Sequence, residues 1–317
     1  MSKIVLSILA LLAAISLIFT GVMFFAIKGF ESYETSVTVD EDAQVIRTDG
    51  DEVRILRFSD VQTKNLIECA IAYPTVKRLV KKYQPDIIIL TGDNISDGSG
   101  ELVLEAFIDL FDSFEIPWAL VFGNHDRNSA NSMQEICSAL EGSEYCLFKT
   151  GYMDDRYGNY HYNIEIGGRV ARTLIFMDSE KSNFTDEQVE WYRDTVNEIS
   201  EQEGRVVPSF VFFHIPIQET NDAYKLYLED PSVGDGFIED PRVQSENTGF
   251  FDAVKELSST DALFFGHDHL NNAIIEYDDV LFCYAMKTGY TVYYDFDRMG
   301  ANLITVSAEN FTIEIVK

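Results

Sequence analysis

The hydrophobic and polar positions of this chain follow two alternating patterns, which together predict an α/β fold. Short runs rich in apolar and β-branched residues predict buried strands at residues 53–58, 86–91, 118–122, 209–213 and 262–265. Longer stretches with helical spacing lie between them, at residues 66–83, 101–114 and 185–202. The last of these opens with Thr185-Asp-Glu-Gln188, which has the form of a capping box. An unbroken apolar run such as 86–91 is typical of a central parallel strand covered on both faces.

Other stretches predict turns, an insertion and antiparallel strands. Gly167-Gly168 joins two alternating segments and predicts a hairpin turn. Pro74, inside the first helical stretch, indicates a kink or a restart of that helix. The acidic stretch near residues 219–247 has the character of a long surface insertion. Beyond Asn271 the period becomes two, which predicts a run of antiparallel strands without a helix.

The N-terminal residues carry a separate signal. From Ile4 to Ile27 the only polar side chains are those of Ser7, Ser16 and Thr20. A membrane-spanning helix needs ~20 apolar residues, and a signal-peptide core only ~7–15. No A-x-A-like cleavage site precedes the first acidic residues. We therefore expect a transmembrane anchor over residues 1–30, with a cleaved signal sequence as the alternative, followed by one domain over residues 31–317.

The orientation of the anchor would decide on which side of the membrane that domain lies. Lys3 precedes the apolar run and Lys28 follows it, so the count of positive charges barely decides the orientation. We expect an extracytoplasmic catalytic domain, which would be secreted if the N-terminal segment is cleaved.

Composition narrows the classes of partner. The 317 residues include 53 acidic and 24 basic side chains, a formal net charge of −29, which argues against nucleic acid as a partner. The 46% of hydrophobic residues is enough for a packed core. The four cysteines have no C-x-x-C spacing. Cys137 and Cys146 are close enough to bridge a short loop in an oxidising compartment, whereas we expect Cys69 and Cys283 to be buried thiols.

The informative polar residues follow the predicted strands. They are Asp60 and Gln62, Asp93, Asn124 and His125, His214, and His267 and His269. Four of the five histidines of the chain belong to this set. Because ligands of open α/β sheets bind outside the carboxyl ends of the strands, these side chains are expected to converge there.

Such a set of side chains predicts metal binding. Carboxylates, an amide oxygen and imidazoles suit divalent ions such as Mn, Fe, Zn or Mg. The seven candidate ligands are Asp60, Gln62, Asp93, Asn124, His214, His267 and His269. They are too many for one tetrahedral site, and fit two ions ~3.5–4 Å apart that share a carboxylate. Glycines beside Asp93, Asn124 and His267 allow close approach of the backbone.

These segments resemble the calcineurin-like metallophosphoesterase superfamily. The matching segments are Asp60-Val-Gln62, Gly92-Asp93, Gly123-Asn-His-Asp126, His214 and Gly266-His-Asp-His269. The resemblance extends from about Val53 to Thr305, and Lys287-Thr-Gly-Tyr290 is among the segments that look most like the purple-acid-phosphatase-like subgroup. It implies a four-layer α-β-β-α sandwich of two mixed sheets.

The resemblance also implies a role for each residue. One ion would be held by Asp60, Gln62, Asp93 and His269, and the other by Asp93, Asn124, His214 and His267, with Asp93 bridging. A hydroxide bridging the two ions would attack phosphorus. His125, which is not a ligand, would contact the phosphate and protonate or stabilise the leaving oxygen. Arg127 is a candidate phosphate contact by adjacency alone, and the alternative is a solvated surface arginine.

Two residues depart from the family pattern. Gln62 stands where the family has a histidine, and its neutral amide oxygen is expected to weaken the first site or shift it toward Mg or Mn. The alternative is that Gln62 only binds a ligated water. Replacing it by histidine is expected to tighten the first site. Ser96 stands where purple acid phosphatases have a tyrosine, so no tyrosinate-to-iron colour is expected.

The function indicated is a phosphatase or phosphodiesterase that acts on a small-molecule or headgroup phosphate ester at a membrane. The alternative is a catalytically impaired relative that binds metal or phosphate as a recognition module. The presence of His125 favours the enzyme, because a structural metal site has no use for it. A nuclease fits poorly with the net charge.

Overall fold

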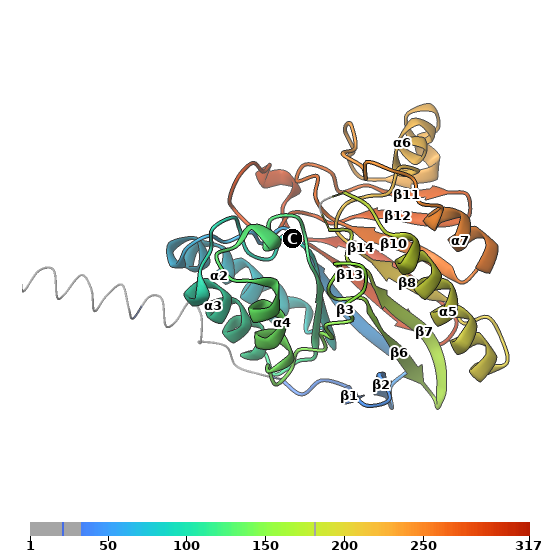
Figure 1. Ribbon diagram of the computed structural model, residues 1–317, viewed down its shortest axis with the longest axis horizontal. Helices are drawn as coiled ribbons and strands as arrows, with labels where there is room; N and C mark the ends of the chain where they lie inside the picture. The colour runs from blue at the N-terminus through green and yellow to red at the C-terminus, as the bar shows by residue number, and fades with distance from the viewer. Residues whose placement is uncertain (1–20, 22–32, 181) are drawn as a thin grey trace, which may run out of the picture.

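Two β-sheets lie face to face in the computed structural model, which describes residue 21, residues 33–180 and residues 182–317 (Figure 1). The five-stranded sheet has the order β14-β13-β3-β4-β5. Its strands are β3 (Glu52–Phe58), β4 (Ile87–Thr91), β5 (Trp118–Val121), β13 (Ala301–Ser307) and β14 (Phe311–Val316). β3, β4 and β5 are parallel, whereas β13 is antiparallel to both β3 and β14. The sheet is therefore mixed, with its parallel part built from the apolar runs of the sequence.

The second sheet has nine strands and is also mixed, in the order β1-β2-β6-β7-β8-β10-β12-β11-β9. The strands are β1 (Val37–Asp40), β2 (Val45–Thr48), β6 (Tyr160–Ile166), β7 (Arg169–Phe176), β8 (Ser209–Phe212), β9 (Gly234–Asp235), β10 (Thr260–Phe265), β11 (Ile274–Tyr277) and β12 (Val280–Tyr284). The neighbours β7, β8, β10 and β12 are parallel. The two mixed sheets confirm the expected α/β class.

The helices cover the outer faces of the sheets. α2 (Leu66–Tyr83), α3 (Glu101–Asp112) and α4 (Met133–Glu141) lie on the side of the five-stranded sheet, and α5 (Asp186–Glu203) and α7 (Phe250–Leu257) on the side of the nine-stranded sheet (Figure 1). α6 (Thr220–Glu229) lies near β11 at the edge. The arrangement fits the four layers implied by the family resemblance.

The side chains along β8 alternate between two hydrophobic clusters, one on each face of the sheet. Phe210 and Phe212 belong to the cluster that includes the five-stranded sheet, whereas Val211 and Phe213 belong to the cluster beneath α5 and α7. Successive side chains of a strand point to opposite faces, so a continuous apolar run is required. Phe212 also stacks between Phe176 and Phe264, with ring centroids 5.2 and 4.9 Å away. These contacts hold the central strands in place, and they therefore also fix the start of the loops that follow these strands.

Several local predictions are confirmed. The capping box of Thr185 is present at the start of α5. Gly167 and Gly168 both have positive φ, +62° and +76°, in the turn between β6 and β7. A two-residue hairpin of this kind requires positive φ at both positions, which glycine adopts without strain.

Other local predictions are refined or wrong. α2 continues through Pro74 as one helix, so the restart is wrong. The stretch at 219–247, predicted as a surface insertion, contains helix α6 and the edge strand β9. Beyond Asn271 the chain is not purely antiparallel, because β12 pairs in parallel with β10, and a short 3₁₀ helix lies at Phe296–Arg298. Tertiary pairing decides strand direction, which a period of two does not encode.

All four cysteines are buried and free, so Cys137 and Cys146 form no disulfide in this structure. Cys69 and Cys283 are buried as expected. The predicted anchor over residues 1–30 lies almost entirely outside the described residues and stays a prediction. Within the part of the chain that the structure describes, no helix has both the length and the apolar character needed to cross a membrane.

Candidate metal centre

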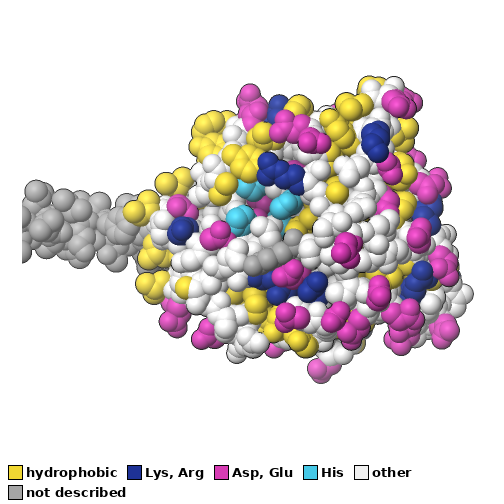
Figure 2. All heavy atoms as spheres, turned by 45° about the horizontal axis from the view of Figure 1, so that its top comes forward, with side chains coloured by type: hydrophobic (Ala, Val, Ile, Leu, Met, Phe, Trp, Pro, Cys, Tyr) yellow, Lys and Arg dark blue, Asp and Glu magenta, His cyan; other side chains and the backbone are white. Residues whose placement is uncertain are grey.

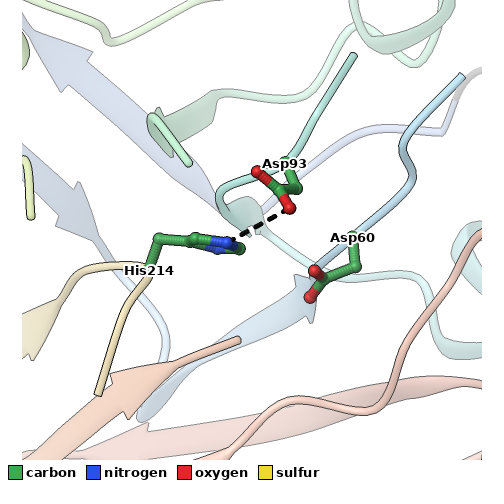
Figure 3. A group of neighbouring side chains, drawn as sticks. All are labelled: Asp60, Asp93 and His214. Carbon is green, nitrogen blue, oxygen red and sulfur yellow. Dashed lines mark ion pairs between the residues drawn. The ribbon is translucent and has the colours of Figure 1, made fainter. Parts of the chain in front are cut away.

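Three loops that follow buried strands bring Asp60, Asp93 and His214 together. Asp60 follows β3, Asp93 follows β4 and His214 follows β8. One ligand atom of each lies within 4.8 Å of the others, and all three residues are buried. Figure 3 shows the two carboxylates and the imidazole directed toward a common point from three separate segments. The strand-end convergence expected from the sequence is therefore present, and it joins both sheets.

Asp93 lies at the centre of these contacts. Its Oδ2 is 3.3 Å from Nε2 of His214, and its Oδ1 accepts a hydrogen bond from the backbone N–H of His125 at 2.9 Å. A Cβ on Gly123 would lie 2.2 Å from Oδ1 of Asp93. A Cβ on Gly92 would lie 2.5 Å from the imidazole of His214. These two glycines are thus needed for close approach, as the sequence indicated.

The backbone is left-handed at four of the predicted ligands. φ is +54° at Asp60, +51° at Gln62, +49° at Asp93 and +74° at His267. Such conformations cost of order 1–3 kcal/mol each for residues other than glycine and persist where surrounding structure enforces them. Here Asp60 N–H donates to Gly92 O at 3.0 Å, and Gln62 N–H donates to Asp93 O at 2.9 Å. The first two loops therefore hold each other in the conformation that directs the carboxylates inward.

Following the family resemblance, we call Asn124, His214 and His267 the Asn124 side of the centre. Nδ1 of His214 is 2.8 Å from the backbone oxygen of Thr91, which turns Nε2 toward Asp93. The rings of His214 and His267 lie edge to face, with centroids 5.2 Å apart. Oδ1 of Asn124 is buried and has no hydrogen-bond partner in the described residues, whereas Nε2 of His214 contacts the Asp93 carboxylate. A buried amide oxygen of this kind and an imidazole beside a carboxylate fit a site for a cation.

Gln62 and His269, with Lys287 beside them, form the Gln62 side. Nε2 of His269 is 3.2 Å from Oδ1 of Asp60, and its Nδ1 is 2.9 Å from the backbone oxygen of Tyr293. The Tyr293 ring stacks on the imidazole, with centroids 4.2 Å apart. Oδ1 of Asp60 has no hydrogen-bond partner, so Asp60 and His269 also fit a cation site.

Gln62 is buried, as a ligand should be, but its oxygen is engaged. Nζ of Lys287 donates to Oε1 of Gln62 at 3.1 Å and to the backbone oxygen of Asp60 at 3.1 Å. Lys287 is itself fully buried. Burial lowers the pKa of Lys287 to about 8, against the opposing effect of the Asp60 and Asp93 carboxylates. The role of Lys287 was missed from the sequence, where the available signal was a lysine directly after the apolar run of β12.

His125 stands beside the centre with a partner that the sequence did not indicate. Its Nδ1 is 2.8 Å from Oδ1 of Asp97, and its Nε2 is 3.9 Å from Oδ2 of Asp93. The side chain is 30% exposed, so it can reach a bound molecule. The contact with Asp97 on Nδ1 leaves Nε2 as the nitrogen that faces the centre. No sequence pattern pairs the two residues, which are 28 positions apart.

Asp126, next to His125, ties two loops together. Its carboxylate accepts N–H bonds from Asn94 and Ile95 at 2.9 Å and from Gly123 at 2.7 Å. Burial and the nearby Asp93 carboxylate raise the pKa of Asp126 to about 7. The last residue of the G-N-H-D segment is therefore structural: it fixes the Asp93 loop against the Asn124 loop.

Arg127 is not a solvated surface residue, and its role as a phosphate contact stays a prediction. Its side chain is 9% exposed and donates to the fully buried carboxylate of Asp178. Asp178 also accepts the N–H of Tyr157 at 2.9 Å. Burial raises the pKa of Asp178, and Arg127 opposes that rise. The surface-arginine alternative is thus wrong, because the loop is anchored to a buried acid 51 residues away.

The histidines of the Asn124 side have opposite pKa shifts. For His214, burial acts to lower the pKa, but the Asp93 and Asp60 carboxylates outweigh it and raise the pKa to about 10. For His267, burial and the neighbouring His214 lower the pKa to about 4. The protein thus presents one protonated and one neutral imidazole at neutral pH when nothing is bound.

The surface around the centre carries histidine and basic side chains. Figure 2 shows histidine side chains gathered on one face with basic side chains above and below them, while acidic side chains lie both beside these groups and around the outline. In a chain with a net charge of −29, these basic side chains are the groups on this face that would attract an anion.

The sequence of the chain is similar to those of known proteins. The family model described as "Calcineurin-like phosphoesterase" matches residues 53–271. The chain is 27% identical to "Probable inactive purple acid phosphatase 28" of Arabidopsis thaliana, over 75% of this chain and 68% of the relative. It is 26% identical to "Phosphatase DCR2" of Saccharomyces cerevisiae, over 76% of this chain and 48% of that protein, so it spans about half of that relative's length.

A solved structure shares the fold. It is a dimetal phosphatase from Danio rerio, which superimposes with a TM-score of 0.52 at 10% identity and covers 84% of this chain and 99% of its own. At this identity the likeness concerns the fold alone.

Proposed function

We propose that this chain, which belongs to the calcineurin-like phosphoesterase family, is a metal-dependent hydrolase of phosphate esters. One observation carries the proposal. Asp60, Asp93 and His214 come from three different loops, are all buried, and place one ligand atom each within 4.8 Å of the others. Two carboxylates and an imidazole grouped in this way suit a divalent cation, and within the described residues Oδ1 of Asn124 is a further buried oxygen without a hydrogen-bond partner.

The residues would divide between two divalent ions as the family resemblance implies, with Asp93 shared. Bound divalent ions supply Lewis-acid polarisation of a phosphoryl oxygen and lower the pKa of water. The protein's part is to hold the ligands rigidly, which the left-handed loops and their mutual hydrogen bonds do. Mn, Fe, Zn and Mg all remain compatible with this mixture of oxygen and nitrogen donors.

His125 would handle the proton of the leaving group. Its Nδ1 is occupied by Asp97, so Nε2 is the atom that would donate to, or hydrogen-bond, the leaving oxygen. Its partial exposure is what such a role requires, since a buried ring could not reach substrate. Asp97 would position the ring and hold the proton on Nδ1.

The substrate would be a small-molecule or headgroup phosphate ester, either a monoester or a diester. The basic groups beside the histidines support an anionic substrate. The anchor expected over residues 1–30 would hold the enzyme at a membrane, with its catalytic domain outside the cytoplasm. Nucleic acid is not proposed as a substrate, because the net charge is −29.

A second candidate function is a catalytically impaired member of the family that binds metal or phosphate for recognition. The observation that favours it is the bond between Lys287 and the only ligating atom of Gln62. One curated relative carries the name "Probable inactive purple acid phosphatase 28".

The experiment that separates the two uses the full chain, stripped of metal with a chelator and then supplied with Mn, Mg, Zn or Fe. Release of nitrophenol is measured from nitrophenyl phosphate and from bis-nitrophenyl phosphate. Turnover that depends on added metal and is lost in Asp93→Ala supports the enzyme, and the ratio of the two rates assigns monoester or diester. Metal binding by calorimetry without turnover on either ester would favour the recognition module.

A further inference from the structure

We propose that Lys287 makes the two sides of the centre unequal, so that the Gln62 side binds its divalent ion far more weakly than the Asn124 side binds its own. The inference rests on the proposed function, because it concerns the same metal ions. It goes beyond the substitution at position 62, since it assigns the weakness to a lysine from a distant segment of the chain.

The position of Lys287 is unusual for an ammonium group. Its side chain is fully buried, and Nζ donates to two neutral acceptors, the oxygens of Asp60 and Gln62, both at 3.1 Å. Within the described residues, no carboxylate lies within ion-pair distance of Nζ. A buried cation without an ion pair is costly, and here it is stabilised only by the general field of the Asp60 and Asp93 carboxylates.

The segment that carries Lys287 is fixed against the first loop of the centre. The N–H of Thr288 donates to Ser59 O at 2.9 Å, and the N–H of Gly289 donates to Asp60 O at 3.1 Å. A Cβ at Gly289 would lie 2.0 Å from the backbone oxygen of Val61. The two segments are therefore in direct contact, and the backbone that carries Lys287 is fixed beside Asp60.

The contact with Lys287 weakens Gln62 as a ligand. An amide side chain has one atom that can bind a cation, its oxygen, and in Gln62 one of the two lone pairs of that oxygen accepts from Lys287. The other atom, Nε2, is buried and has no partner in the described protein. As a hydrogen-bond donor it suits a water or phosphate oxygen and opposes a cation. Gln62 is thus a donor group that Lys287 orients.

The two sides consequently offer different environments to a cation. On the Asn124 side, Oδ1 of Asn124 accepts no hydrogen bond within the described residues, and Nε2 of His214 is paired with Asp93, a carboxylate that would itself be a ligand. On the Gln62 side, Asp60 and His269 remain, but the ammonium group of Lys287 stands beside them. Like charges repel strongly where water is excluded, so a dication on this side is destabilised both by a weakened ligand and by Lys287.

This arrangement changes the expectation for Gln62→His. Alone, the new imidazole would lie beside the ammonium that Gln62 now accepts from, so a single substitution gains a ligand but keeps the repulsion. Removing the charge by Lys287→Met frees the Gln62 oxygen and removes the repulsion together. The double variant is expected to bind most tightly on this side.

The test is a calorimetric titration of the metal-stripped full chain with Mn²⁺, with the ions retained after desalting counted by elemental analysis. The wild type is expected to bind two ions in two steps and to retain one. Lys287→Met should tighten the second step by about 10–100-fold, the range seen for residues that orient metal ligands, and leave the first unchanged. Gln62→His should change the second step little, and the double variant should retain two ions. Lys225→Met, an exposed lysine, is the matched control.

Several outcomes overturn the inference. Two ions bound with equal affinity by the wild type would do so, and so would a second step unchanged in Lys287→Met. If that variant does not fold, Lys287→Gln replaces it, and the wild-type stoichiometry decides independently. A chain that binds no Mn²⁺ contradicts both the inference and the proposed function. Two unequal steps that respond to Lys287→Met, without ester hydrolysis, uphold the inference and contradict the function.

Discussion

The Asn124 side and the Gln62 side each contain an amide residue and at least one histidine. They differ in what the ligating atoms of these residues contact. On the Asn124 side, Oδ1 of Asn124 is buried without a hydrogen-bond partner in the described residues, and Nε2 of His214 contacts a carboxylate. On the Gln62 side, the oxygen of Gln62 accepts a hydrogen bond from Lys287. A motif match counts residues, whereas metal binding depends on what their ligating atoms contact. The comparison teaches that a departure from the family pattern has to be judged together with the neighbours that it meets in the fold.

His125, the proposed proton donor, is built into the Asn124 side. It lies next to Asn124 in the chain and donates its backbone N–H to Asp93. Its partner, Asp97, comes from the loop after β4, the same loop that carries Asp93. The proposed proton donor and the Asn124 side thus share two loops.

The largest effect is expected from Asp93→Ala, because Asp93 contacts His214 and would be shared by both ions. Loss of metal-assisted stabilisation worth several kcal/mol corresponds to a decrease in kcat of roughly a thousandfold or more, at about 1.4 kcal/mol per factor of ten. The measurement is steady-state hydrolysis of nitrophenyl phosphate, with circular dichroism to check the fold. Wild-type turnover in a folded variant would show that the centre is assigned to the wrong residues.

His125→Ala is expected to lower kcat by about 10²–10⁴-fold, the usual contribution of a general acid, while both metal-binding steps remain as in the wild type. Elemental analysis and kinetics on the same preparation test this. His161, the histidine outside the centre, supplies the control, and His161→Ala should leave kcat unchanged. A loss of bound metal in His125→Ala would make His125 a ligand.

Gly123→Ala should impair metal binding at the centre, because the new Cβ would lie 2.2 Å from Oδ1 of Asp93. Overpacking of this kind typically costs about 1–3 kcal/mol of stability. The free energy of unfolding in urea and the first Mn²⁺ step are the measurements. Gly100→Ala is the comparison, since a Cβ there meets nothing within 4 Å. Equal losses in the two variants would contradict the proposed close contact.

The smallest expected effect is the pH dependence of stability and of metal binding that His214 causes. The pKa of His214, about 10 without metal, lies above that of an unfolded histidine, ~6.5, so its pairing with Asp93 stabilises the metal-free fold fully below pH ~6.5. That stabilisation is lost as pH rises through about 10. Binding of the first ion at pH 7 should therefore release about one proton, because a coordinating imidazole must be neutral.

Calorimetry in two buffers with different ionisation enthalpies measures that release. The metal-free Tm is expected to fall between pH 7 and pH 10, and to fall less in the metal-loaded protein. Binding of the first ion with no proton exchange would show that His214 is already neutral or is not a ligand.

The sequence was sufficient for the scaffold and for the residue types of the centre. The apolar runs at 86–91 and 209–213 form β4 and β8, because a strand that is buried on both faces needs apolar residues at successive positions. The polar residues directly after those strands, Asp93 and His214, were therefore placed correctly at the sheet ends. These features depend on residues that are close together in the chain, and the order of such residues can be taken directly from the sequence.

Only the tertiary structure decided which side chains touch. Lys287 reaches Gln62 across 225 residues, and Arg127 reaches Asp178 across 51. The amino-acid pattern is the same whether these groups are solvated or paired, because burial and contact between distant segments arise from the packing of the two sheets. The sequence alone determined that carboxylates, amides and imidazoles converge, whereas the folded chain determined which of their atoms remain free for a cation.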